Sequence, residues 1–219
     1  GIAALEAQRA SLGDAVVDVM LSTLREKLAA LKAQAASADT PAGQRKQISV
    51  LFGDLYGFTA LSENLDAEEL REGINALWQR LDAVIIEHGG VIDKHLGDGV
   101  MALWGVLAAR GDPSEQAVRA GLAIQAHLAD SPAGYQMRIG ITTGFAFLGS
   151  IGTTQEFTAM GDTVNLAARL EQAAPPGGVL ISHDTYRQVR GVFDCQVQPP
   201  LAVKGKSESM QTYLVLRPK

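Results

Sequence analysis

Two aspartates of this sequence stand where apolar stretches give way to glycine-containing turns. Asp54 ends one such stretch, and Asp98 lies between two glycines at the tip of a predicted hairpin. Two carboxylates that converge without a basic partner repel each other, and a divalent cation relieves that repulsion. Mg²⁺ binds one or two carboxylates and completes its shell with phosphate oxygens. The pair therefore predicts a metal and phosphate site, although a helix cap and a turn residue would explain each aspartate alone.

Two further groups of residues have the chemistry to bind phosphate and sugar. Backbone N–H groups at a predicted helix start follow the first aspartate, at Gly57, Phe58 and Thr59, and would suit a polyphosphate. Asn165 and Arg169 are spaced to lie on one face of a helix, where an amide and a guanidinium could bind a sugar and a phosphate. A solvated helix face, or a neighbouring carboxylate, explains this second pair equally well.

The elements that must position these side chains follow the order of a split βαβ fold. The predicted order is strand 48–54, helix 66–88, strands 91–95 and 100–104, helix 113–129 and strand 137–143. Asp66 and Asp112 are the predicted N-caps, and Gly89 stops the first helix. In such a sheet the first strand and the hairpin are neighbours, so Asp54 and Asp98 should meet at one edge.

The remainder of the chain is predicted to add short strands and one helix to this core. Strands near 146–151 and 156–160 come first, then a helix over 163–173, then strands 179–182, 193–197 and 212–216. Asp162 is the predicted cap of that helix. The fold class is α+β, a ferredoxin-like split βαβ core with an antiparallel sheet and flanking helices, preceded by an N-terminal helix.

The N-terminal stretch is predicted to be a separate helix over 1–35. Its leucines and valines recur at alternating four- and three-residue steps, which is typical of a dimeric coiled coil or of an amphipathic helix packed on its own domain. Residues 36–46 read as a linker and 47–219 as the main domain. We expect the helix to transmit a signal from an upstream regulatory domain, an expectation that deletion of 1–35 would test through dimerisation and activity.

Composition excludes several classes of protein. Of 219 residues, 47% are hydrophobic and 20% charged, as in a soluble globular domain, and the longest apolar runs are far too short to cross a bilayer. A net charge of −5 gives no footprint for nucleic acid. The single Cys195 excludes an internal disulfide and a cysteine zinc cluster. We therefore expect a cytoplasmic location, either as a separate protein or as the cytoplasmic part of a larger, membrane-bound one.

Five segments in order resemble the catalytic domain of the class III nucleotidyl cyclases. They are Phe52-Gly53-Asp54-Leu55-Tyr56-Gly57-Phe58-Thr59, Lys94-His95-Leu96-Gly97-Asp98, Arg138-Ile139-Gly140-Ile141-Thr142-Thr143-Gly144, Met160 to Leu170, and Val203-Lys204-Gly205-Lys206. The resemblance extends over about residues 47 to 218, and five blocks in family order are a specific signal.

The resemblance implies an adenylyl cyclase that forms cyclic AMP and pyrophosphate from ATP. Asp54 and Asp98 would hold two Mg²⁺ or Mn²⁺ ions per active site. Asn165 would orient the ribose, and Arg169 would stabilise the transition state. Lys204 would reach the terminal phosphates. In this family the two halves of each site face each other across a head-to-tail dimer, so a homodimer is expected.

Two positions bear on the choice of base. Lys94 is a donor, which suits adenine N1, and Thr158 aligns with the second base-reading position, where its hydroxyl can accept from the 6-amino group. Guanylyl cyclases generally have an acidic residue at the position of Lys94. The threonine resembles the subclass in which bicarbonate activation is described. Strand alternation places His95 on the face opposite Lys94.

Two departures from the family pattern leave alternatives open. The segment 152–156 lacks an arginine that many relatives use to bind the polyphosphate, and Gly53 stands where another small residue is usual. Without that arginine, phosphate binding would depend on Lys204, Lys206 and the metals. A non-catalytic nucleotide-sensing or dimerisation module, and a guanylyl cyclase, are the alternatives to an adenylyl cyclase.

Overall fold

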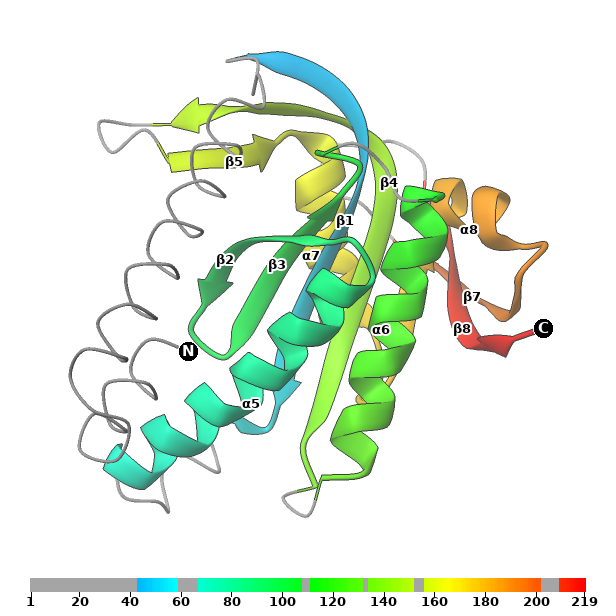
Figure 1. Cartoon of the computed structure of the whole chain (residues 1–219). Helices are drawn as coiled ribbons and strands as arrows, with labels where there is room; N and C mark the ends of the chain where they lie inside the picture. Colours follow the sequence, from blue (N-terminus) through cyan, green and yellow to red (C-terminus); the bar gives the residue numbers. More distant parts are fainter. Residues whose placement is uncertain (1–42, 59–66, 108–110, 132–133, 152–155, 202–208) are drawn as a thin grey trace. The chain divides into compact units, whose positions relative to one another are not determined.

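The computed structural model describes residues 43–58, 67–107, 111–131, 134–151, 156–201 and 209–219 (Figure 1). The elements in chain order are β1 (Gln44–Tyr56), α5 (Ala67–Glu87), β2 (Val91–Leu96), β3 (Gly99–Trp104), α6 (Pro113–Ala129), β4 (Gln136–Ile151), β5 (Glu156–Met160), α7 (Asp162–Ala173), β6 (Val179–Ser182), α8 (His183–Val189), β7 (Phe193–Leu201) and β8 (Met210–Pro218). The helix expected over 1–35, most of the linker and the Asp66 cap lie outside the described residues. Strand β1 already begins at Gln44, before residue 47.

The strands form one sheet in the order β2-β3-β1-β4-β6-β8-β7, and β5 pairs with β4. The first four strands are antiparallel throughout, while α5 and α6 cover one face and α7 the other (Figure 1). This is the predicted split βαβ core, and the fold prediction is confirmed. One pair of strands differs from the expected antiparallel sheet: β4 and β6 run parallel.

The central strands are apolar in unbroken runs because helices cover both of their faces. On β1, Leu51 packs into the cluster beneath α5 and α6, while its neighbour Val50 packs into the cluster beneath α7. The register places Asp54 opposite Gly99 of β3 and opposite Arg138 of β4. The end of β1 is thereby fixed between two strands.

Local signals at two helix ends are confirmed. Asp112 accepts hydrogen bonds from the N–H groups of Ser114 and Glu115, so it is the N-cap of α6. After α5, Gly89 adopts φ 75°, and the N–H groups of Gly89 and Gly90 bond to the last carbonyls of the helix. Both ends follow from local sequence alone.

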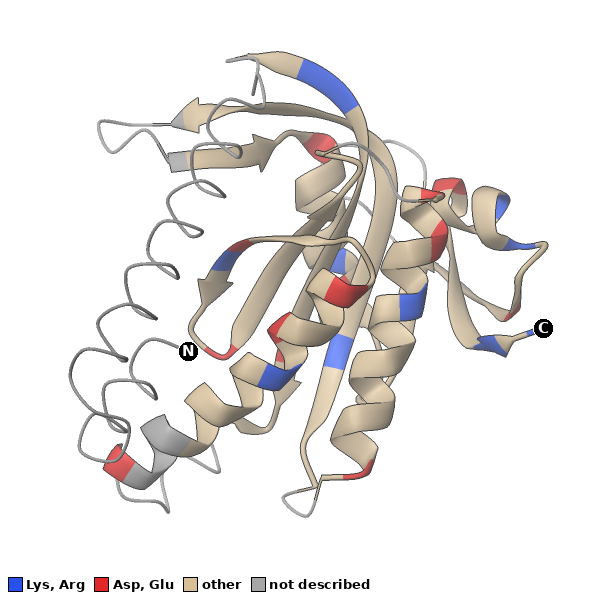
Figure 2. Cartoon of the chain, in the orientation of Figure 1, with Lys and Arg blue, Asp and Glu red and all other residues tan. Residues whose placement is uncertain are grey.

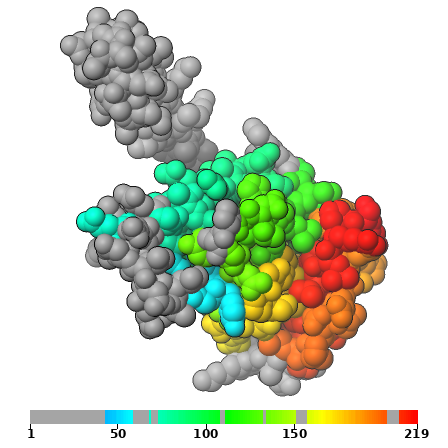
Figure 3. All heavy atoms as spheres, turned by 90° about the horizontal axis from the view of Figure 1, so that it is seen from below, coloured from blue at the N-terminus to red at the C-terminus, as the bar shows by residue number. Residues whose placement is uncertain are grey.

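Three predictions beyond this core are corrected. Strand β4 runs unbroken over 16 residues where two shorter strands were expected. Helix α8 was not predicted. Asp162 is the first residue of α7 and not its cap, since Gly161 at φ 121° takes that position and no side chain caps the helix. In Figure 3 the segment from α8 to the C-terminus, coloured orange and red, occupies one flank of the domain.

Acidic and basic residues are mixed along the described part of the chain. Figure 2 shows acidic and basic residues interspersed over most of the elements, in keeping with 19 basic and 24 acidic residues in the chain. Among the described residues, no helix is both long enough and apolar enough to span a membrane.

Candidate active site

The two aspartates lie close together at one end of the sheet. Asp54 pairs in register with Gly99, and the N–H of Leu55 donates to the carbonyl oxygen of Asp98 at 3.2 Å. The hairpin approaches β1 closely at its turn. Gly97 adopts φ 67° there, and a Cβ on Gly99 would lie only 3.1 Å from the Gly53 carbonyl oxygen. The structure therefore places this carboxylate pair (Asp54 and Asp98) together, as predicted.

The carboxylate pair has a basic partner, contrary to the sequence-based expectation. Arg138 lies directly opposite Asp54 on β4, and its Nη2 donates to Asp54 Oδ2 at 3.1 Å. Its guanidinium carbon also lies 5.8 Å from the centre of the Tyr56 ring. The expectation was wrong because it considered β1 and the hairpin but not the strand on the other side of β1.

A third acid, Glu171 on α7, shares the same guanidinium. Its Oε1 lies 3.5 Å from Arg138 Nη2, and among the described residues this oxygen accepts no hydrogen bond. Helix and strand approach closely because Gly140 has no side chain: a Cβ there would lie 2.1 Å from the Glu171 nitrogen. The helix that carries Asn165 and Arg169 is thus packed against the strand that supports Asp54.

Electrostatics at this end of the sheet favour added positive charge. Burial raises the pKa of Asp54, and the Asp98 carboxylate raises it further, while the hydrogen bond from Arg138 opposes both. Burial, followed by the Asp54 carboxylate, raises the pKa of Glu171 to about 7. One guanidinium does not neutralise three acids, so the site fits a divalent cation. Within the described residues, no group of three or more histidine, cysteine, aspartate or glutamate side chains is arranged to hold a metal ion.

A separate cavity of about 380 Å³ collects three other predicted residues: Lys94 of β2, Thr158 of β5 and Asn165 of α7. Its walls are largely apolar and include the side chains of Phe52 and Met101. We call it the β2–β5 cavity. Apolar walls with a few convergent polar groups are typical of a site for a flat ring. The carboxylate pair is not among its lining residues.

A residue that sequence reasoning missed joins two of these side chains. Asp93 Oδ2 accepts from the Thr158 hydroxyl at 2.7 Å and lies 3.3 Å from Lys94 Nζ. The Asp93 side chain is only 2% exposed. A β-bulge between Ile92 and Lys94 leaves Asp93 without a partner on β3, so the side chains of Asp93 and Lys94 lie beside each other on one face of the sheet although the residues are consecutive. An acid immediately before Lys94 was the available signal in the sequence.

The other predicted residues fall in three groups. His95 contacts Asp82 at 3.1 Å and the Trp78 ring on the α5 face, which confirms that it points away from Lys94. Gly57 and Phe58 directly follow β1, where Gly57 adopts φ 75° and Phe58 packs against the core. Thr59, Lys204, Lys206 and residues 152–155 lie outside the described residues.

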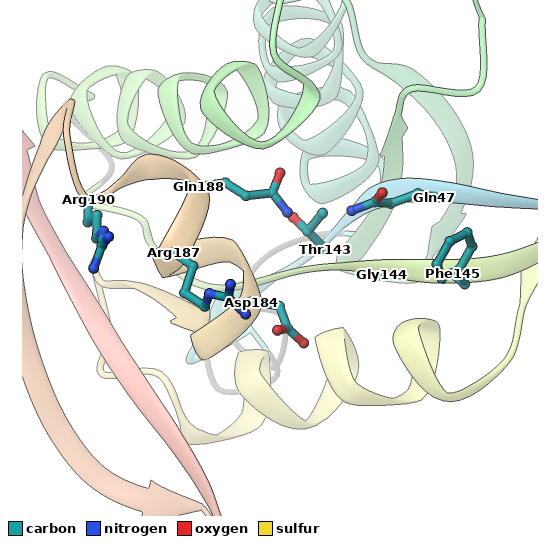
Figure 4. A pocket seen from close by; sticks show the side chains of 8 residues that line it. All are labelled: Gln47, Thr143, Gly144, Phe145, Asp184, Arg187, Gln188 and Arg190. Carbon is teal, nitrogen blue, oxygen red and sulfur yellow. The ribbon is translucent and has the colours of Figure 1, made fainter.

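A second cavity, of about 490 Å³, lies between β4 and α8 (Figure 4). Its lining consists of Gln47, Thr143, Gly144, Phe145, Asp184, Arg187, Gln188 and Arg190. Figure 4 shows the side chains of Gln47 and Gln188 on either side of Thr143. The Thr143 hydroxyl hydrogen-bonds to Ser49 at 2.8 Å and to Ser114 at 3.1 Å. The Thr185 hydroxyl of α8 donates to Thr143 at 3.2 Å, so buried hydroxyls behind this cavity connect α6 and α8 to the sheet.

The fold and these two groups of side chains define a nucleotide cyclase domain. The chain belongs to the adenylate and guanylate cyclase catalytic domain family, whose model matches residues 40–217. Adenylate cyclase 1 of Rhizobium meliloti is 32% identical over 187 residues, which cover 80% of this chain and 28% of the relative. An adenylate cyclase of Mycobacterium tuberculosis is 29% identical, and the match covers 78% of this chain and 40% of the relative. The chain thus spans well under half of these relatives.

Solved structures agree with this assignment. The adenylyl cyclase CyaB from P. aeruginosa is 36% identical, with a TM-score of 0.75, and the match covers 80% of this chain and 96% of that one. The guanylate cyclase domain of RhGC from Catenaria anguillulae, solved in complex with GTP, is 28% identical, also with a TM-score of 0.75, over 80% of this chain and all of that one. Similar folds thus occur in cyclases named for either purine.

Proposed function

We propose that this chain is an adenylyl cyclase, which converts ATP into 3′,5′-cyclic AMP and pyrophosphate. The observation that carries the proposal is the β2–β5 cavity, which joins Lys94, Thr158 and Asn165 within apolar walls. Lys94 can only donate, as adenine N1 requires, and the Thr158 oxygen can accept from the 6-amino group. Guanine presents an N1–H donor beside an O6 acceptor, which this pair fits poorly.

The carboxylate pair supports the same reaction. Asp54 and Asp98 would hold Mg²⁺ or Mn²⁺ ions, which when bound supply Lewis-acid activation of the ribose 3′-hydroxyl and neutralise triphosphate charge. The 3′-oxygen forms a bond to the α-phosphorus in line with the bond that breaks, and pyrophosphate leaves with its electron pair. Asn165 would orient the ribose, Arg169 would stabilise charge that develops on the α-phosphate, and Lys204 would bind the terminal phosphates.

Two copies of the chain would complete each site. In one chain the carboxylate pair does not line the cavity that holds the base-reading residues. A symmetric dimer would place the carboxylates of one copy against the cavity of the other, and would form two equivalent sites. The N-terminal helix would then be placed to set the geometry of the two copies.

Product formation from ATP and from GTP, with Mn²⁺, tests the proposal. We expect cyclic AMP as the main product, and a loss of at least about a hundredfold in Asp54→Asn, which removes a charge from the metal site. Asp194→Asn is the matched control, because Asp194 pairs with Arg217 at 3.1 Å between β7 and β8. A clean dimer that makes no cyclic AMP, or one that prefers GTP, would refute the proposal.

Mixing two inactive variants tests the shared site. In a dimer of Asp54→Ala with Arg169→Ala, one site carries both defects and the other carries neither. We expect activity to return on mixing. If each copy held a complete site of its own, the mixture would stay inactive.

A further inference from the structure

We infer that Asp93 determines the preference for adenine by fixing the proton of the Thr158 hydroxyl. This inference rests on the proposed function. It names a positioning residue that does not touch the base itself. The contacts that carry it are the 2.7 Å hydrogen bond from Thr158 to Asp93 Oδ2 and the 3.3 Å approach of Lys94 Nζ to the same oxygen.

A threonine alone does not distinguish the two purines by hydrogen bonding. Its hydroxyl has one proton and two lone pairs, and it rotates to donate or to accept as its neighbours require. It could therefore accept from the 6-amino group of adenine or donate to O6 of guanine. A second group must remove one of these choices before the threonine can be selective.

Asp93 removes the choice because an ionised carboxylate can only accept. The proton of Thr158 is committed to Asp93, and the lone pairs that remain on the Thr158 oxygen are left for the cavity. The oxygen then presents an acceptor to the base, which matches the adenine 6-amino group and opposes guanine O6. Thr158 is 7% exposed and the Asp93 side chain 2% exposed, so little water competes for this hydrogen bond.

Asp93 also places the charge of Lys94. A buried carboxylate needs a cation or several donors nearby, and Lys94 supplies the cation at the rim of the cavity, with its side chain 41% exposed. The bulge in β2 makes this arrangement possible, because it turns two consecutive side chains to the same face of the sheet. One acid thus sets both the donor and the acceptor that read the base.

The test uses a substrate that lacks only the 6-amino group, purine riboside 5′-triphosphate, which keeps N1. The measured quantity is the ratio of kcat/KM for ATP to kcat/KM for this analogue. Any loss that acts through Lys94, or through the fold, affects both substrates and cancels in the ratio. Only a change at the 6-amino contact alters it.

Without Asp93 the Thr158 hydroxyl can again either donate or accept, so we expect Asp93→Ala to lower this ratio by up to about tenfold, the effect of weakening one buried hydrogen bond. Thr158→Val removes the acceptor altogether and should lower the ratio at least as far, and Asp93→Ala should cause no further loss in the Thr158→Val background, because both changes act on the same contact. Asp82→Ala is the control, since Asp82 contacts His95 on the opposite face of β2, and it should leave the ratio unchanged.

An unchanged ratio in Asp93→Ala, or losses that multiply in the double variant, would overturn the inference. Dissociation constants of the two nucleotides, measured in parallel by calorimetry, give the corresponding ratio of ground-state affinities without turnover. A wild-type protein that binds ATP but forms no product would therefore count against the proposed function, while an unchanged binding ratio would count against Asp93.

Discussion

Replacing Glu171 with glutamine tests whether a buried acid beside the carboxylate pair controls the pH dependence of stability. The pKa of Glu171 is about 7 in the folded domain, against an ordinary value of 4.5, because of burial and the nearby Asp54 carboxylate. Between these two values the folded domain retains a proton that the unfolded chain has released. The free energy of unfolding therefore falls as the pH rises from 4.5 through about 7, and it stays at the lower value above pH ~7.

The magnitude follows from the two pKa values. The gap between 4.5 and about 7 corresponds to at most about 3 kcal/mol of unfolding free energy, of which about 2 kcal/mol is lost between pH ~5.5 and pH ~8. The Glu171 side chain is only 11% exposed, so solvent screens this effect little. Glutamine cannot ionise, so Glu171→Gln should lack this part of the pH dependence.

Denaturant unfolding near both pH values, in EDTA, measures the effect. A chelator is needed because a bound cation would stabilise the ionised carboxylate. Some dependence of the same sign should remain in Glu171→Gln, since the pKa of Asp54 is also raised. The control is Glu115→Gln, an acid that pairs with Arg119 on the outer face of α6 and should leave the wild-type dependence in place. Equal pH dependence in the wild type and in Glu171→Gln would refute the reasoning.

Two further predictions concern packing and capping. Gly140→Ala should destabilise the domain by at least about 3 kcal/mol in denaturant unfolding, because the new Cβ would collide with the backbone of α7. Gly73→Ala on α5 should instead stabilise the domain by about 0.5–1 kcal/mol, because a Cβ at that position meets open space. Equal effects of the two substitutions would contradict the packing described. Asp112→Ala should cost about 1 kcal/mol because two N–H groups of α6 lose their acceptor, and an unchanged unfolding midpoint would show that the cap contributes nothing.

The core elements could be predicted because their signals are local. Helices α5 and α6 combine 3.6-residue periodicity with a glycine stop or an aspartate cap, and the apolar strand β3 follows the mixed strand β2 after a glycine turn. Strand β4 was divided because Gly144 resembles a break. Its real role is to admit Thr163 of α7, whose Oγ1 would lie 2.8 Å from a Cβ at that position. Helix α8, with seven residues, is too short to show a period.

The carboxylate pair and the base-reading residues could be proposed from the sequence, but their supporting residues could not. Arg138 is 84 positions from Asp54, and only the register of β1 against β4 brings them together. Glu171 reaches the same guanidinium through close packing of α7 at Gly140. A bulge is one extra residue without a fixed sequence signature, so alternation along β2 could not place Asp93 beside Lys94.

The extra residue in β2 also affects how the β2–β5 cavity can change during evolution. The five other residues of β2 pair with five consecutive residues of β3, and Asp93 alone has no partner in that ladder. An in-frame deletion of its codon would preserve the pairing, keep Lys94 in position and remove only the carboxylate. Conversely, one inserted codon would add a buried acceptor beside the lysine of a regular strand. If Asp93 sets the purine preference as we infer, that preference would be gained or lost through a single insertion or deletion, without substitution of Lys94 or Thr158.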